Sequence, residues 1–500
     1  LKAAQAEEHG RQEDLFKVYT ERAWPACNVI VGNPPFLGDK LMRRELGGDY
    51  VTQLRRVFDG RLPGQADFCC YWFEKARQQI EDGYCGRAGM LATQNIRGGA
   101  SRTALERIKQ TGDIFFGISD REWILNGAMV HISMVGFDDG TESEKLLNGK
   151  EVGTIHANLT VGADLTAARR LADSANIGFI GSCKGGPFDL PESEAVDLLL
   201  NSPNPHGRPN SDVLCPVVNS EDIYGCQPRR WIIDNADKTC EQASLYERPH
   251  AIVVSRVKPK RDENRDKWLR VNWWRPQRMR PEMRNAIANL DRFLVTATTS
   301  KHRIFVWLAQ PVLPDHKLVV FARADDCFFG ILQSRVHELW AQNVGTQLRE
   351  RESGLNYNVQ SSCETFPMPD PSPEQRAAIS DAAKELNALR ENWLNPPEWT
   401  TLRTLEFPGA KDGPWARFVT NPDARGIGTV RYPLTEPRDA ESAAKLAKRT
   451  LTNLYNERPA WLANAHATLD AAVADAYGFP VESSDDEILA RLLELNLARA

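Results

Sequence analysis

The chain has 500 residues, too many for one hydrophobic core, and this length indicates several domains. Its hydrophobic fraction of 42%, its charged fraction of 26% and the absence of a long apolar run exclude a disordered, collagen-like or membrane-spanning protein. The net charge of −5 argues against a surface that is basic throughout. The first residue is Leu and no signal-peptide pattern follows, so we expect a piece of a longer protein.

The ten cysteines are spaced irregularly, with neither a Cys-x-x-Cys pair nor a histidine cluster at the spacing of a zinc site. Such cysteines are typical of a protein that is kept reduced inside the cell. We therefore expect free thiols, a cytoplasmic location and no metal site.

The first 150 residues alternate short apolar runs with helix-like segments. This alternation is typical of an α/β sheet covered by helices, and it predicts one domain over residues 1–150. The expected strands are 27–31, 88–93, 114–118 and 129–137, and the expected helices are 67–81 and 101–111.

The middle of the chain is divided by turn-rich segments. Residues 151–213 are interpreted as a connecting segment with one helix that begins near Pro191. Residues 214–370 are rich in Trp and Arg and predict a second domain of α+β structure. The glycine clusters at 183–186 and 407–410 are expected to be turns, and the expected strands are 251–257, 304–308 and 318–322.

The last stretch, residues 371–500, predicts an all-α domain. Ser372 with Gln375 three residues later has the pattern of a helix capping box, and Ser484 with Glu487 has the same pattern. Apolar residues recur at helical spacing after each box. The expected helices are 372–393, 441–455, 461–476 and 484–498.

The motif that carries chemistry is Asn33-Pro34-Pro35-Phe36, directly after the apolar strand. The prolines fix φ and lack backbone donors, so the Asn33 amide and the Pro34 carbonyl can face a cleft at the strand's carboxyl end. Two oxygen acceptors suit an amine on an aromatic ring. When they bind the amine protons, the nitrogen lone pair is no longer delocalised into the ring and can act as a nucleophile. Phe36 offers a face on which a flipped base can stack, which contributes about 1–3 kcal/mol.

This strand and turn resemble motif IV of the amino methyltransferases that use S-adenosylmethionine, above all those specific for adenine in DNA. The resemblance implies that Asn33, Pro34, Pro35 and Phe36 are the catalytic residues and that Asn33 also contacts the cofactor. It implies no metal, since methyl transfer from a sulfonium is an in-line displacement that positioning can promote.

Two further segments resemble parts of the same enzymes. Residues 67–76 resemble the motif V helix, which implies that Asp67 and Trp72 help to hold S-adenosylmethionine, although Cys69 stands where an aromatic residue is common. Residues 129–137 resemble motif VIII, which packs beside the target base. Within it, we expect His131 to be a core histidine with a satisfied hydrogen bond.

A basic segment at 255–303 contrasts with the acidic remainder of the chain. It contains fourteen Lys or Arg and five Asp or Glu, a local net charge of +9, with Trp268, Trp273 and Trp274 interleaved. This pattern indicates contacts with phosphates and bases, and the alternative is a solvated basic surface with the Trp side chains in the core. The expected contacts are Lys258, Lys260, Arg261, Arg275, Arg278 and Lys301.

The same region resembles the target-recognition domain of the type IIL, MmeI-like restriction-modification enzymes. The matching pieces are 273–274, 291–292, 300–302, 332–340 and 364–369, and they add His302 and Arg335 to the expected DNA contacts. Downstream, 454–459 and 465–478 resemble the helical C-terminal domain of that group. The resemblance therefore spans nearly the whole chain and implies duplex DNA as a partner.

One expected part is missing upstream of Asn33, namely the glycine-rich loop that holds the methionine end of the cofactor. We therefore expect the C-terminal part of a Rossmann-like methyltransferase sheet, followed by an α+β target-recognition domain and an all-α domain. An N-terminal segment of the same protein would bind most of the S-adenosylmethionine, and the chain alone would lack methyl transfer. A nuclease or defence-system subunits are further partners that the resemblance allows.

Two other functions stay open at the level of sequence. The chain could be a sequence-specific DNA-binding fragment without catalysis. Motifs of the form Asn-Pro-Pro-aromatic also occur in methyltransferases that act on RNA or on protein glutamine, so the substrate could differ.

Overall fold

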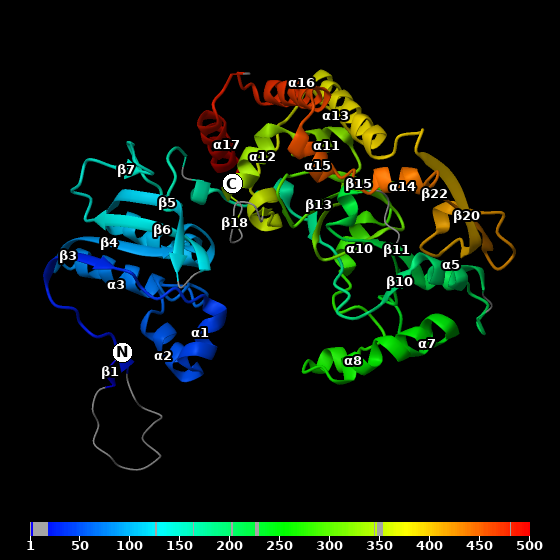
Figure 1. Ribbon diagram of the computed structural model, residues 1–500, viewed down its shortest axis with the longest axis horizontal. Helices are drawn as coiled ribbons and strands as arrows, with labels where there is room; N and C mark the ends of the chain where they lie inside the picture. The colour runs from blue at the N-terminus through cyan, green and yellow to red at the C-terminus, as the bar shows by residue number, and fades with distance from the viewer. Residues whose placement is uncertain are drawn as a thin grey trace, which may run out of the picture. The chain divides into compact units, whose positions relative to one another are not determined.

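The computed structural model describes residues 2–3, 19–125, 128–163, 165–201, 204–225, 230–344, 346–347, 354–480 and 482–500. The chain forms two compact units, one made mainly of Leu1–Ala168 and the other mainly of Arg169–Gly345 and Gly354–Ile488 (Figure 1). Among the described residues, no helix is long and apolar enough to cross a membrane.

The first unit is built on a six-stranded sheet of order β3-β4-β6-β5-β7-β8. β3 and β4 are parallel, whereas β6 is antiparallel to both β4 and β5. The four predicted strands are confirmed, and each of them is longer than predicted, β5 by the most. The strands are β3 (Cys27–Gly32), β4 (Cys85–Thr93), β5 (Asp113–Leu125), β6 (Ala128–Asp138), β7 (Leu146–Leu147) and β8 (Lys150–Glu151).

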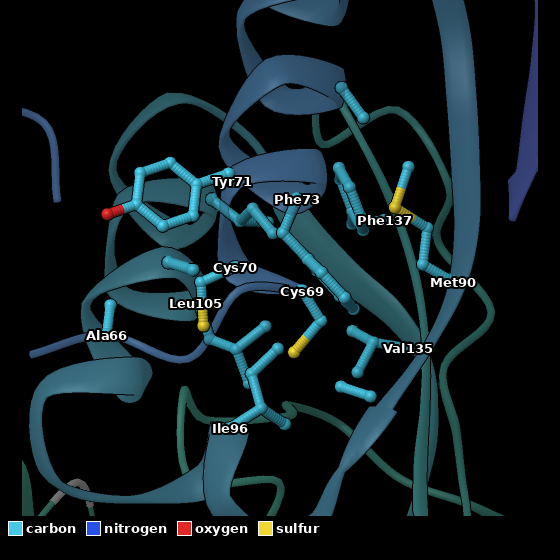
Figure 2. Packing of buried hydrophobic residues seen from close by; sticks show 14 of the residues in the cluster. Ala66, Cys69, Cys70, Tyr71, Phe73, Met90, Ile96, Leu105, Val135 and Phe137 are labelled. Carbon is cyan, nitrogen blue, oxygen red and sulfur yellow. The ribbon is translucent and has the colours of Figure 1, made fainter. Parts of the chain in front are cut away.

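Helices pack on this sheet through an apolar layer. Figure 2 shows Phe73 and Phe137 in this layer, and their rings stack with centroids 6.0 Å apart. The predicted helix 67–81 begins only at Cys70, and the predicted helix 101–111 begins at Thr103. The helices are α1 (Asp39–Leu46), α2 (Gly48–Val57), α3 (Cys70–Glu81) and α4 (Thr103–Thr111), and a short pair β1 (Lys2–Ala3) and β2 (Tyr19–Thr20) precedes them.

The second unit contains two four-stranded sheets. The first, of order β15-β13-β17-β9, is antiparallel, and its strands confirm the predictions near 304–308 and 318–322. The second has the order β10-β12-β11-β16. The strands are β9 (Gly178–Ile180), β10 (Asp189–Pro191), β11 (Leu214–Val218), β12 (Arg230–Ile233), β13 (Arg292–Ala297), β15 (Val306–Ala309), β16 (Leu313–Pro314) and β17 (Leu318–Phe321).

The predicted strand 251–257 is wrong, because this segment belongs to the helix α7 (Glu247–Arg256) and the residue that follows it. Pro249, Val253 and Val257 are buried at intervals of four residues, whereas Val254 is 40% exposed. An apolar run alone does not distinguish helix from strand, and here the burial follows the helical period.

Further helices and short strands complete this part of the unit. The helix predicted near Pro191 is confirmed as α5. The remaining elements are α5 (Glu192–Leu200), α6 (Cys240–Ser244), α8 (Lys258–Asp262), α9 (Lys267–Val271), α10 (Pro281–Ile287), β14 (Thr299–Ser300), α11 (Asp326–Gln333), α12 (Arg335–Val344) and β19 (Leu355–Asn356). The short strand β18 (Thr346–Gln347) belongs to the first unit.

The C-terminal helices begin where the sequence predicts. Both capping boxes form, at Ser372 with Gln375 and at Ser484 with Glu487. The predicted helix 441–455 is instead two helices, because the Thr450 hydroxyl accepts a hydrogen bond from the backbone of Asn453 and starts a new one. α13 and α16 lie side by side (Figure 1). The helices are α13 (Pro373–Leu394), α14 (Ala440–Leu446), α15 (Leu451–Glu457), α16 (Ala460–Tyr477) and α17 (Asp485–Arg499).

The C-terminal region is not all-α, since a three-stranded sheet of order β20-β22-β21 interrupts the helices. The predicted turn at 407–410 lies inside β20, where Leu405 and Phe407, two residues apart, are both buried. Phe407 packs edge to face on Trp415 with ring centroids 4.9 Å apart. The alternation of buried residues is that of a strand with one face on a core. The strands are β20 (Thr400–Ala410), β21 (Val419–Thr420) and β22 (Ile427–Pro437).

Candidate active site and basic surface

The turn Asn33–Phe36 leaves the sheet at the carboxyl end of β3. Pro34 is buried, Asn33 and Pro35 are exposed, and Phe36 is half-buried. The Leu37 backbone donates a hydrogen bond of 3.1 Å to the Pro35 carbonyl, which closes the turn. The rigid prolines therefore hold the Asn33 side chain at the surface at the end of the strand.

A pocket of about 440 Å³ opens beside this turn. Its walls are β3 and the turn as far as Pro35, completed by Trp24, Trp72 and Met90. The structure thus brings Asn33, Pro34, Pro35 and Trp72 around one cavity, while Phe36 and Asp67 lie outside its lining. Trp24 and Met90 were not predicted, because nothing in their local sequence distinguishes them from core residues.

Two of the residues that line this pocket carry oxygen acceptors without partners in the described part of the chain. Neither the Asn33 side-chain amide nor the Pro34 carbonyl bonds to another residue in the described part of the chain. Polar groups held by a rigid turn and left without internal partners are available to a ligand.

Trp72 reaches the pocket from the second residue after the start of α3. Its indole packs edge to face on Phe68, with ring centroids 4.7 Å apart. Cys69 is 1% exposed and belongs to the core, so this residue makes no wall of the pocket. The Cys70 thiol beside it, together with burial, raises the pKa of Cys69 well above its usual value.

Asp67, predicted to help hold the cofactor, forms hydrogen bonds within the protein through its carboxylate and its backbone N–H. One carboxylate oxygen accepts the Asp39 backbone N–H at 3.1 Å, and the other accepts the Asn95 side-chain amide at 3.2 Å. Its own backbone N–H donates to the Ser101 hydroxyl at 3.0 Å. Asp67 therefore joins the segment after β3 to the segment after β4.

His131, on β6, is half-buried, and its Nδ1 lies 2.7 Å from the Asp120 carboxylate on β5. This geometry agrees with the interpretation of His131 as a histidine with a satisfied hydrogen bond.

Some of the residues predicted to contact DNA are exposed, and others already form ion pairs or hydrogen bonds within the protein. Lys260, Arg278 and Lys301 are exposed. Lys258 is paired with Asp262 at 2.6 Å. Arg275 donates to the Asn272 side chain at 2.8 Å and lies 5.1 Å from the Trp274 ring centroid.

Arg261 is a structural residue, and its position does not support the predicted DNA contact. It is 1% exposed, and its guanidinium donates to the carbonyl oxygens of Lys184, Gly185 and Arg275 at 2.9 to 3.3 Å. Burial lowers its pKa. The cation therefore holds the 184–185 loop inside the unit.

The three tryptophans of the basic segment also differ in exposure. Trp273 and Trp274 pack against the core, and the Trp274 indole N–H donates to the Lys238 carbonyl at 2.9 Å. Trp268 alone of the three is exposed, at 39%. The interleaved pattern in the sequence thus combines two core residues with one surface residue.

The two contacts taken from the resemblance both touch C-terminal helices. The His302 Nε2 lies 2.8 Å from the Asn456 side-chain oxygen. The Arg335 guanidinium pairs with Asp485 and donates to the Ser483 carbonyl at 3.3 Å.

Metal ligands do not gather anywhere in the described ranges. Nine cysteines are free thiols, and the tenth, Cys226, lies outside the described residues.

Known protein families match both units. Residues 5–148 match the family model described as MmeI, DNA-methyltransferase domain, and residues 183–370 match MmeI, target recognition domain. The fold and the site thus define a class, a DNA-methyltransferase domain followed by a target-recognition domain. The chain belongs to the MmeI-like family, of which it carries these two domains.

Individual relatives agree with this assignment. The chain is 23% identical over 388 residues to DNA methyltransferase A of Bacillus subtilis (strain 168), covering 72% of this chain and 41% of that protein. It shares its fold with the solved structure of the type IIL restriction-modification enzyme MmeI in complex with DNA, with a TM-score of 0.67 and 19% identity. That match covers 95% of this chain and 57% of the other, so the chain spans about half the length of these relatives.

Proposed function

We propose that the complete protein transfers a methyl group from S-adenosylmethionine to the exocyclic N6 amine of adenine in duplex DNA, as part of a restriction-modification or phage-defence system. The observation that carries the proposal is the pair of unpartnered acceptors, the Asn33 side-chain oxygen and the Pro34 carbonyl, beside the pocket at the carboxyl end of β3.

These two acceptors bind the amine protons and turn the nitrogen toward a tetrahedral geometry. The nitrogen lone pair, no longer delocalised into the ring, forms a bond with the methyl carbon as the carbon–sulfur bond breaks. One proton then leaves the product nitrogen to solvent. S-Adenosylmethionine supplies the methyl group, and the geometry around Asn33 supplies the orientation.

The pocket fits an aromatic group of the cofactor. Trp72 and Met90 give it apolar walls, and Asn33 gives it a polar one. In our proposal Trp72 borders the cofactor. Asp67 holds the segments after β3 and β4 together through its hydrogen bonds with Asp39 and Asn95.

The free edge of β3 supports a further segment beside it. Among the described strands β3 pairs only with β4, and Val29 and Val31 on this edge strand are 50% and 83% exposed. Exposed apolar side chains on an unpaired edge are a site for an additional strand. We propose that upstream residues of the same protein pair there and hold most of the cofactor.

The DNA-facing surface in this proposal is the exposed part of the basic segment. Lys260, Arg278 and Lys301 are free to contact phosphates, whereas Arg261 is not. Such contacts position a protein on duplex DNA and make its affinity depend on salt.

The test compares methylation by the complete protein with that of Asn33→Ala, using labelled S-adenosylmethionine and mass spectrometry of the digested DNA. We expect N6-methyladenine from the wild type and a loss of about a hundredfold or more from Asn33→Ala, with duplex binding retained. Asn28→Ala, an exposed Asn on the same strand, is the control and should keep activity.

Other outcomes separate the alternatives. Duplex binding without any methylated product would favour a binding fragment. Methylated RNA or methylated glutamine in place of methyladenine would change the substrate class. Methyl transfer by the 500-residue chain without upstream residues would contradict the proposal that cofactor binding depends on them.

A further inference from the structure

The loop that carries Lys301 and His302 is attached to the C-terminal helices on two sides. It begins at β14, where Ser300 pairs with Leu355 of β19, and Lys301 is exposed at its tip. Three residues after Lys301 the chain is in the core, since Ile304 is 1% and Phe305 0% exposed. The loop is thus a short surface excursion between two buried positions.

The first attachment is the buried cation Arg390 of α13. It is 1% exposed and donates to the Phe305 carbonyl at 2.8 Å, to the Gln333 side-chain oxygen at 3.1 Å and to the Tyr455 hydroxyl at 3.3 Å. Among the residues described, no carboxylate forms an ion pair with it. A buried guanidinium without a counter-ion is costly, and here its two terminal nitrogens donate to these acceptors while Nε has no partner.

Gln333 completes this attachment by bonding the loop's returning backbone. Its side-chain oxygen accepts the Phe305 backbone N–H at 2.9 Å, and its amide donates to the Arg303 carbonyl at 3.1 Å. The Arg303 side chain in turn donates to the Leu355 carbonyl at 2.9 Å. The returning end of the loop is therefore held by side chains, and Arg390 anchors that end to α13.

The second attachment lies on α15. The Asn456 side-chain oxygen accepts from the His302 ring at 2.8 Å, and the neighbouring Tyr455 ring lies 5.9 Å from that ring. The Tyr455 hydroxyl donates to His466 at 2.9 Å. Burial lowers the pKa of His466 to about 4, so this ring stays neutral near pH 7.

We propose that Arg390 and Asn456 are positioning residues for target recognition: the C-terminal helices fix the Lys301–His302 loop in the geometry in which it reads DNA. This inference rests on the proposed DNA-binding function of the loop. It extends the recognition apparatus to two residues that lie outside the target-recognition match at 183–370.

The physical reason is the entropy of the loop. A short polar loop that is held at both ends and at His302 loses little freedom when it contacts bases. A loop released at His302 must be ordered on binding, and this cost falls on the specific complex, in which side chains must take one geometry. Contacts of lysine and arginine with phosphates tolerate more movement and are affected less.

The experiment measures sequence selectivity separately from affinity. The 500-residue chain is bound to a pool of duplexes with a randomised core, the bound fraction is sequenced, and affinity for one scrambled duplex is titrated. We expect Asn456→Ala to reduce enrichment of the preferred sequence about threefold to tenfold, and Arg390→Met about tenfold or more. Affinity for the scrambled duplex should stay within about twofold of wild type.

Controls isolate the positioning role. Asn453→Ala makes the same substitution on the same exposed helix, where Asn453 bonds only within its own segment, and it should leave enrichment unchanged. Asn456→Asp keeps an oxygen acceptor for His302 and should restore enrichment. In a His302→Ala background, Asn456→Ala should have no further effect.

The outcomes distinguish the inference from the function on which it rests. If the wild-type chain binds duplex DNA without enriching any sequence, or does not bind it, the proposed recognition function fails and the inference with it. If the wild type enriches a sequence and Asn456→Ala and Arg390→Met do so equally well, the inference alone is overturned. A variant that loses enrichment and scrambled-duplex affinity together indicates general unfolding and also contradicts a positioning role.

Discussion

Glu74 of α3 is the centre of a buried ion-pair network whose removal should weaken the first unit strongly. The carboxylate is 0% exposed and accepts from Arg77 at 2.9 and 3.0 Å and from Arg107 at 2.9 Å. Arg77 is 2% exposed, and these bonds together with those of Glu81 raise its pKa although burial lowers it. Glu74→Ala would leave a buried guanidinium without its bidentate partner.

The expected cost of Glu74→Ala is about 3–5 kcal/mol, the range for breaking a buried pair on one side. Glu81 bonds the same guanidinium at 2.7 Å, yet its side chain is 42% exposed, so Glu81→Ala should cost about 1 kcal/mol or less. The double variant Glu74→Leu with Arg77→Met removes both charges and should cost less than Glu74→Ala alone.

Hydrogen exchange read by mass spectrometry suits this test, because a chain of two units need not unfold in one step. Peptides of α3 and β4 should exchange more than about a hundredfold faster in Glu74→Ala, which corresponds to the lower end of the expected cost. The reasoning is refuted if Glu74→Ala and Glu81→Ala accelerate exchange equally, or if the double variant is the least stable of the three.

Three further predictions concern the second unit. Burial lowers the pKa of His337 to about 3, so the folded protein keeps this ring neutral, whereas the unfolded chain binds a proton near pH 6.5. The contribution of His337 to the free energy of unfolding should therefore be complete above pH 6.5 and decrease by about 1.4 kcal/mol per pH unit toward pH 3. An acid titration of His337→Gln should lack this decrease. A Cβ on Gly330 would lie 2.7 Å from the Ile379 side chain, so Gly330→Val should cost about 1–3 kcal/mol, measured by thermal unfolding, and an unchanged midpoint would contradict the close packing of α11 on α13. Replacing both Lys260 and Arg278 by Gln should lower the slope of log affinity against log salt by about 1.8 on duplex DNA, and an unaltered slope would exclude them as phosphate contacts.

Local spacing alone was sufficient to predict several features of this protein. The strand before Asn33, the turn with two prolines and the capping boxes at Ser372 and Ser484 depend on residues a few positions apart. Backbone restriction by proline and bonds from a cap side chain act over that same short range, so the sequence is enough to place them. The order of the motifs then indicated the family that the domain matches assign.

Other features depend on contacts between distant residues. The segment with Leu405 and Phe407 forms a strand because it pairs with β22 and Phe407 packs on Trp415. Residues 251–257 are helical because the positions that pack against the core recur every fourth residue. A count of charges does not show which cations the fold itself uses, and Arg261 proved to be bonded to three carbonyls inside the unit. Likewise, Asp67 faces two loops instead of the pocket.

The sequence by itself determined the turn that carries the Asn33 amide and the Pro34 carbonyl, since a few consecutive residues set its geometry. Only the tertiary structure decided which side chains surround them and which charges remain exposed. Burial and pairing arise from packing of segments far apart in the chain, and that packing decides whether Arg261 or Lys260 is available to a partner.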